Sequence, residues 1–179
     1  IQLIGRYGLF DMISEMVLVS GAETVRTPLF VGVEGVDPID GRDRGNIIES
    51  NGLDGITVNS PGSISFANNS VKFNGTGGVD LDPGGTLTMS IKANDISENL
   101  GIGIDANAAG MIVLTVRENL IRNNVDSVVN DGVVTGDGIE LRTLPTGTIH
   151  LTATGNFIEG NDGRGIDLLN FGTMQMKIG

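Results

Sequence analysis

The sequence contains no cysteine, no tryptophan, one tyrosine and six phenylalanines. Without cysteine, the chain forms no disulfide bonds and no thiolate metal sites. The scarcity of tryptophan and tyrosine leaves almost no aromatic platforms for stacking sugar rings. Uninterrupted apolar runs are also short, so we expect no membrane-spanning helix.

Basic residues are the second shortage. Eleven lysines and arginines stand against 22 aspartates and glutamates, which gives a formal net charge of −11. Such a surface repels phosphate backbones and anionic membranes. We therefore expect neither a nucleic-acid partner nor insertion into a membrane.

The sequence does contain many glycines, 28 in all, and an internal repeat. Each copy begins with Asn, an aliphatic segment and a second Asn, and continues to a Gly-aliphatic-acid-aliphatic segment or a variant of it. The leading residues are Asn46, Asn69, Asn94, Asn119 and Asn156. In four of the five copies the glycine of the second segment follows nine positions later. Repeats of about 25 residues are typical of solenoids.

A third segment with period-two alternation lies between the copies, as in Met111–Val116. Each repeat of about 23–25 residues therefore holds three short strands, which bury nothing alone but stack in parallel from coil to coil. The fold class is all-β, a parallel β-helix that is regular over 46–179 with a loop insertion near 125–137. We expect residues 1–45 to form one or two irregular coils.

The leading asparagines have a structural explanation. The corner between two strands needs left-handed backbone, which Asn and Gly tolerate best. Stacked Asn side chains also satisfy one another's hydrogen bonds along a column. We predict that Asn46, Asn69, Asn94, Asn119 and Asn156 form such a ladder.

These repeats resemble the right-handed parallel β-helix repeats of the pectate-lyase-like superfamily and, more closely, repeats of very large bacterial surface proteins. The resemblance covers Asn46 to Gly179. It implies a right-handed coil and is specific for the fold. It does not identify an activity, because the same repeat occurs in lyases, hydrolases, adhesins and proteins without known chemistry.

The acid of each Gly-aliphatic-acid segment is predicted to point outward. The candidates for catalysis are Asp80, Asp105, Glu140 and Asp167. In one column they would lie about 5 Å apart, near the carboxylate separation of retaining glycosidases. The alternative is a solvated face, because a repeat places an acid in every coil whether or not a site exists.

The insertion offers Asp126, Asp131 and Asp137 as oxygen ligands for Ca²⁺. It lacks the fixed spacing of a calcium loop, so a solvated polar loop is the favoured interpretation. No other cofactor is indicated.

The preferred functional hypothesis is a non-catalytic structural module, extracellular or on a bacterial cell surface, that serves as a spacer, adhesin segment or filament subunit. The alternatives are a polysaccharide lyase or glycoside hydrolase, and a carbohydrate-binding module. The closing strand, Thr173–Ile178, has no polar cap. The expected partners are therefore other copies of the chain or further repeats of a longer one, and a polysaccharide under the alternatives.

Overall fold

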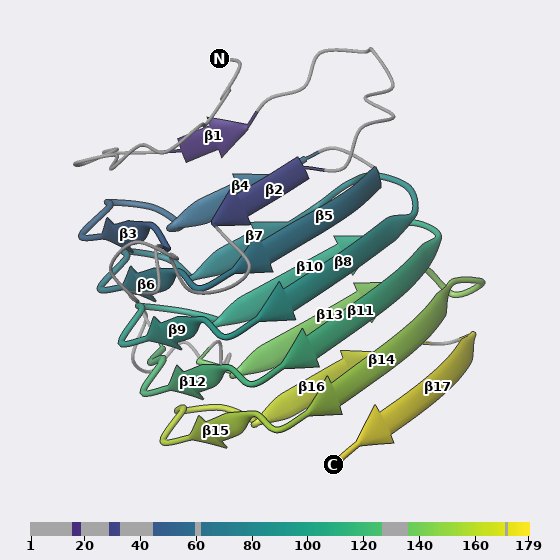
Figure 1. Cartoon of the computed structure of the whole chain (residues 1–179). Helices are drawn as coiled ribbons and strands as arrows, with labels where there is room; N and C mark the ends of the chain where they lie inside the picture. Colours follow the sequence, from purple (N-terminus) through teal and green to yellow (C-terminus); the bar gives the residue numbers. More distant parts are fainter. Residues whose placement is uncertain (1–15, 19–28, 33–44, 60–61, 127–135, 171) are drawn as a thin grey trace, which may run out of the picture.

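The computed structural model describes residues 16–18, 29–32, 45–59, 62–126, 136–170 and 172–179. Three parallel sheets wind around one core as a solenoid of about five coils, with the N-terminal strands at the top of Figure 1 and β17 at the bottom. The described residues include no helix, and so none that could cross a membrane.

Each sheet takes one strand from each coil. The first sheet contains β1 (Met16–Leu18), β4 (Ile56–Val58), β7 (Val79–Leu81), β10 (Ile104–Ala108), β13 (Ile139–Thr143) and β16 (Ile166–Leu169). The second contains β2 (Leu29–Gly32), β5 (Gly62–Ala67), β8 (Leu87–Lys92), β11 (Met111–Arg117), β14 (Thr148–Thr154) and β17 (Thr173–Ile178). The third contains β3 (Ile47–Glu49), β6 (Ser70–Lys72), β9 (Asp95–Ser97), β12 (Leu120–Arg122) and β15 (Phe157–Glu159). The predicted parallel β-helix with three strands per coil is confirmed.

The core consists of aliphatic columns that run along the solenoid axis. On the first sheet, for example, Ile104 pairs in register with Val79 on one side and Ile139 on the other, and all three are buried. Equivalent columns rise from the second and third sheets and merge into one cluster. Because strands alternate inward and outward residues, these columns follow directly from the period-two pattern of the sequence.

The predicted asparagine ladder is present at the corner between the second and third sheets. From Asn69 onward, the side-chain Oδ1 of each ladder Asn accepts hydrogen bonds from the backbone N–H and the Nδ2 of the equivalent Asn in the preceding coil, at 2.8–3.0 Å. Asn94 Nδ2 also donates to the carbonyl oxygens of Phe66 and Lys92. The ladder therefore satisfies buried polar groups in every coil.

A second ladder, which sequence reasoning did not predict, occupies the next corner. Its bonds of 2.9–3.2 Å repeat the same pattern. Its members are Asn51, Asn74, Asn99, Asn124 and Asn161. The signal was in the sequence, because the repeat carries a second Asn five positions after the first.

The expectation that the ladder asparagines themselves are left-handed is wrong. Positive φ falls on the residue before the ladder Asn, as at Ala93 (φ 54°), Glu98 (φ 59°) and Glu118 (φ 58°). A non-glycine residue in this region costs about 1 kcal/mol or more. The residue before the Asn therefore makes the turn of the chain. The Asn itself directs its side-chain amide into the corner, and the hydrogen bonds of the ladder offset the backbone strain.

The insertion leaves the stack undisturbed. Asn119 and Asn156 are 37 positions apart, whereas the preceding ladder pairs are 23 or 25 positions apart, yet their side chains bond at 3.0 Å. The extra residues fall between the second corner and β13, and 127–135 lie outside the described residues. Of residues 1–45, for which the sequence predicts one or two irregular coils, the structure describes β1, β2 and residue 45, and β1 and β2 extend the first and second sheets.

We predict that Asn94→Leu lowers the free energy of unfolding by about 1–3 kcal/mol, because the backbone groups bonded to Asn94 lose their partners inside a buried corner. Chemical denaturation measures this change. The matched control is Asn107→Leu, the same substitution at an exposed position of β10, where we expect less than about 0.5 kcal/mol. Equal losses at the two positions would contradict the buried role of the ladder.

Candidate functional site

The four candidate acids form one column on the outer side of the first sheet. Register pairs Asp105 with Asp80 and with Glu140, and Glu140 with Asp167. Neighbouring strands of a sheet lie about 4.8 Å apart, so successive carboxylates are close. The four acids therefore do lie in one column, as the repeat predicts.

One acid of the column is buried, whereas Asp80, Asp105 and Asp167 are partly exposed. Glu140 is only 3% exposed, and its carboxylate pairs with Arg142, two residues further along β13. Burial lowers the pKa of Arg142, but the hydrogen bond to Glu140 and the charges of Asp105 and Glu140 outweigh it and raise that pKa. Alternation placed the glutamate outward correctly and said nothing of what would surround it.

Asp105 sits in the middle of this column with one oxygen, Oδ1, buried and without a hydrogen-bond partner. Burial has the largest effect on the pKa of Asp105 and raises it. The charge of Arg142 lowers this pKa in part, repulsion from Glu140 and Asp80 raises it again, and the resulting pKa is about 6. Burial and repulsion from Asp54 and Asp82 likewise raise the pKa of Asp80 to about 6. Asp80 and Asp105 are therefore adjacent carboxyl groups that take up protons near neutrality.

The acid at the other end of the column has a cation beside it. Asp167 pairs with Arg164 at 2.5 Å. Two of the four candidates, Glu140 and Asp167, are thus engaged in ion pairs, which leaves Asp80 and Asp105 as the acids available for chemistry. Proton transfer at a reacting oxygen is the chemistry that a carboxyl with such a pKa performs best.

Of the three calcium candidates, the structure describes Asp126 and Asp137. The backbone N–H of Arg164 donates to Asp137, which is 1% exposed, and the Asp126 N–H donates to Asp162 at 3.2 Å. Asp131 lies outside the described residues. Over the described ranges no group of three or more His, Cys, Asp or Glu side chains is arranged to hold a metal ion.

Three parallel sheets around one core, joined by asparagine corners, define the class of parallel β-solenoid proteins. Residues 34–178 match the family model described as the right-handed beta helix region, so the chain belongs to that family. No similarity to a curated protein or to a solved structure was found. The family shows the fold, while the function has to be argued from the sites.

The acidic column predicts an unusual pH dependence of stability. In the unfolded chain Asp80 and Asp105 regain a pKa of 3.8, against about 6 when folded. The folded state therefore binds more protons between those values, and the contribution of these two groups to stability falls as the pH rises from about 4 to about 6.

Asp105→Asn removes one of the two carboxyl groups that lower the stability of the folded protein as the pH rises. We expect the variant to be more stable than the wild type at pH 7.5 by about 1 kcal/mol, and the difference to vanish near pH 4. Urea titrations at the two pH values measure it. The control is Glu98→Gln at an exposed corner. A wild type that is more stable than Asp105→Asn at pH 7.5 would contradict the conclusion that the acidic column is partly desolvated.

Proposed function

We propose that the chain is a non-catalytic structural β-solenoid, a rigid segment of an extracellular or bacterial cell-surface protein. The observation that carries the proposal is the unbroken regularity of the stack. Both asparagine ladders run through every described coil, including the one with the insertion. A site that binds and transforms a substrate normally interrupts such a repeat, because its residues are chosen for chemistry instead of stacking.

The coil of residues 156–179 is suited to further stacking. Its strands β15, β16 and β17 lie at the outer edges of their sheets. Residues that continue the core columns are exposed there, Met174 by 41%, Met176 by 53% and Ile178 by 58%. Open parallel edges with an apolar interior accept another coil. We therefore propose further coils, from another copy or from a longer chain, as the partner of this end.

A second candidate function is a polysaccharide lyase or glycoside hydrolase. The raised pKa values of Asp80 and Asp105 favour it, since perturbed carboxyl groups cluster at active sites. Three observations weigh against it. The acid belongs to the repeat, Glu140 is buried, and among the described residues Arg142 and Arg164, the cations nearest the column, are bound to its own acids.

An activity assay separates the two functions. We expect the purified protein to leave polygalacturonate, alginate and neutral glucans uncut, with or without Ca²⁺. Reducing ends would report a hydrolase, and new ultraviolet absorbance would report the unsaturated product of a lyase. Cleavage that Asp105→Asn abolishes, while Glu98→Gln leaves it intact, would replace the structural proposal with the enzymatic one.

A further inference from the structure

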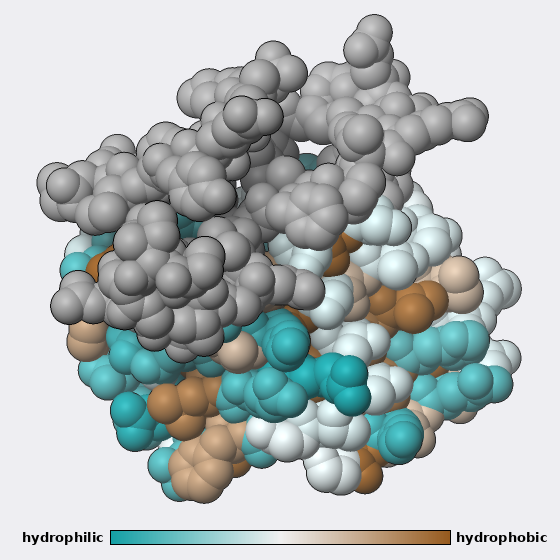
Figure 2. Space-filling view, viewed as in Figure 1, coloured by the Kyte–Doolittle hydropathy of each residue, from teal (hydrophilic) through white to brown (hydrophobic). Residues whose placement is uncertain are grey.

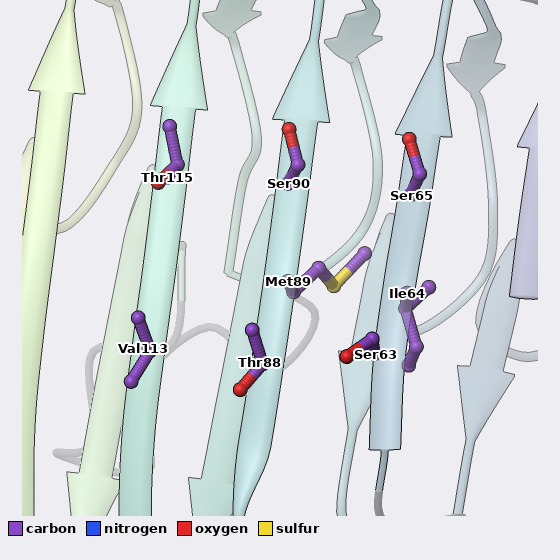
Figure 3. A pocket seen from close by; sticks show the side chains of 8 residues that line it. All are labelled: Ser63, Ile64, Ser65, Thr88, Met89, Ser90, Val113 and Thr115. Carbon is purple, nitrogen blue, oxygen red and sulfur yellow. The ribbon is translucent and has the colours of Figure 1, made fainter. Parts of the chain in front are cut away.

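Polar side chains occupy two very different environments in the solenoid. Figure 2 shows that much of the described surface is hydrophilic or of near-neutral hydropathy. On the second sheet, Ser65, Ser90 and Thr115 lie on the outer face beside a shallow recess (Figure 3). The amides of the second ladder are instead enclosed, and Asn74 and Asn99 are 0% exposed. Solvent therefore reaches these amides only when the corner opens.

Both Asn–Gly pairs of the sequence fall in the second ladder, at Asn51–Gly52 and Asn74–Gly75. Glycine has no β-carbon, so its backbone nitrogen approaches the side chain of the residue before it without hindrance. In an unstructured chain this nitrogen attacks Cγ of the asparagine and displaces the side-chain amide as ammonia. The ladder therefore contains residue pairs whose own chemistry destroys the amides that the ladder needs.

Packing requires the glycine after Asn74. A β-carbon at Gly75 would lie 2.5 Å from the carbonyl oxygen and 2.8 Å from the carbonyl carbon of Gly52. These atoms belong to the backbone of the preceding coil, which cannot move away without disturbing the stack. The equivalent positions of the next two coils hold Leu100 and Val125. The fold itself therefore places a reactive pair at this corner, whereas the next two coils lack one.

The folded structure restrains the attacking group. The N–H of Gly75 donates to the carbonyl oxygen of Asn51 at 2.8 Å and to that of Leu53 at 3.0 Å, so its hydrogen is shared between two acceptors. Attack requires this nitrogen to lose its proton to a base from solvent and to turn its lone pair toward Cγ of Asn74. Neither step occurs while both hydrogen bonds persist in a buried corner.

The carboxamide of Asn74 is restrained as well. Its Oδ1 accepts hydrogen bonds from the backbone N–H and the Nδ2 of Asn51, at 3.2 Å and 2.9 Å. Its Nδ2 donates to the carbonyl oxygen of Ile48 at 3.3 Å and to Oδ1 of Asn99 at 2.9 Å, which uses both hydrogens of the amide. The side chain therefore cannot rotate toward Gly75 without breaking the bonds that join three successive coils.

The product of this reaction does not fit the corner. An oxygen would replace Nδ2 of Asn74, and it would face two further oxygens, those of Ile48 and Asn99. The ladder would lose two donated hydrogen bonds there, and the new carboxylate would be a charge in a buried site. Isoaspartate, the second product, also adds a carbon to the main chain, which shifts the register of the strand that follows.

We propose that Asn74–Gly75 is a self-modification site, which the folded solenoid keeps unreactive and which deamidates when the second corner opens. The Gly75 nitrogen loses its proton to hydroxide and bonds to Cγ of Asn74. The Cγ–Nδ2 bond breaks, and the departing nitrogen takes up a proton from water and leaves as ammonia. Water then opens the resulting succinimide at either carbonyl, which gives aspartate or isoaspartate. A coil that stays open long enough is modified before it closes, and it does not restack.

Mass spectrometry of the full chain at pH 8 tests the proposal. Trypsin releases residues 73–92, in which Asn74 is the only asparagine. We expect deamidation of this peptide to be at least about tenfold slower in the folded protein than in protein held unfolded in guanidinium chloride, because reaction requires opening. The matched control is Asn99, which belongs to the same ladder but precedes Leu100. In the unfolded chain we expect Asn99 to react at least about tenfold more slowly than Asn74, since the β-carbon of Leu100 hinders attack.

A refolding experiment tests the consequence for the stack. Protein unfolded for increasing times is diluted into native buffer, and size-exclusion chromatography separates refolded from misfolded chains. We expect modification at residue 74 to be enriched in the misfolded fraction and nearly absent from the refolded one. Asn74→Asp imitates one product, and we expect it to lower Tm by about 5 °C or more, or to prevent folding. Asn107→Asp, the same change at an exposed position of β10, is expected to keep Tm within about 2 °C of the wild type.

Three results of these experiments would overturn the proposal. They are equal rates of deamidation in the folded and unfolded protein, equal rates at Asn74 and Asn99 in the unfolded chain, and refolded protein that carries the modification at residue 74. A wild-type Tm of the Asn74→Asp variant would also contradict it. These outcomes are independent of the proposed structural function, because none of them measures binding or activity.

Discussion

The hydrogen bonds between asparagine side chains at the two corners hold successive coils of the solenoid together. From Asn51 onward, the residue before each ladder Asn has left-handed backbone, and several of these residues are neither Gly nor Asn. The ladder bonds offset that strain and also fix the height of every coil relative to the next. Once the corners are stacked, the strands fall into register, and the aliphatic columns follow.

Much of the fold could be predicted from the sequence, because every coil of a solenoid repeats the same residue pattern. Period-two alternation identified the inner residues, and the spacing of the leading asparagines identified one ladder. The second ladder, to which Asn51, Asn74 and Asn99 belong, was not predicted, although these residues recur five positions after the leading Asn. The conformation of the residue before each Asn has no sequence signature, since Ala, Glu, Phe and Ser all occupy it.

The candidate sites were less predictable, because the burial and the ion pairs of each acid depend on the side chains around it. Alternation placed Asp105 and Glu140 outward, but not the burial of Glu140 or its pairing with Arg142. The regular scaffold thus carries an acidic column that is partly desolvated, and this property depends on the neighbours of each carboxylate.

Amide hydrogen exchange tests the central role of the ladders most directly. The backbone N–H groups of Asn69, Asn74, Asn94 and Asn99 donate to the next Asn side chain. They therefore belong to the stack, although they lie at corners. The account predicts that they exchange as slowly as the buried strand amides of Ile104 and Ile112, at the rate of global unfolding. Fast exchange at these corners alongside protected strands would show that the strands hold the solenoid together without the ladders.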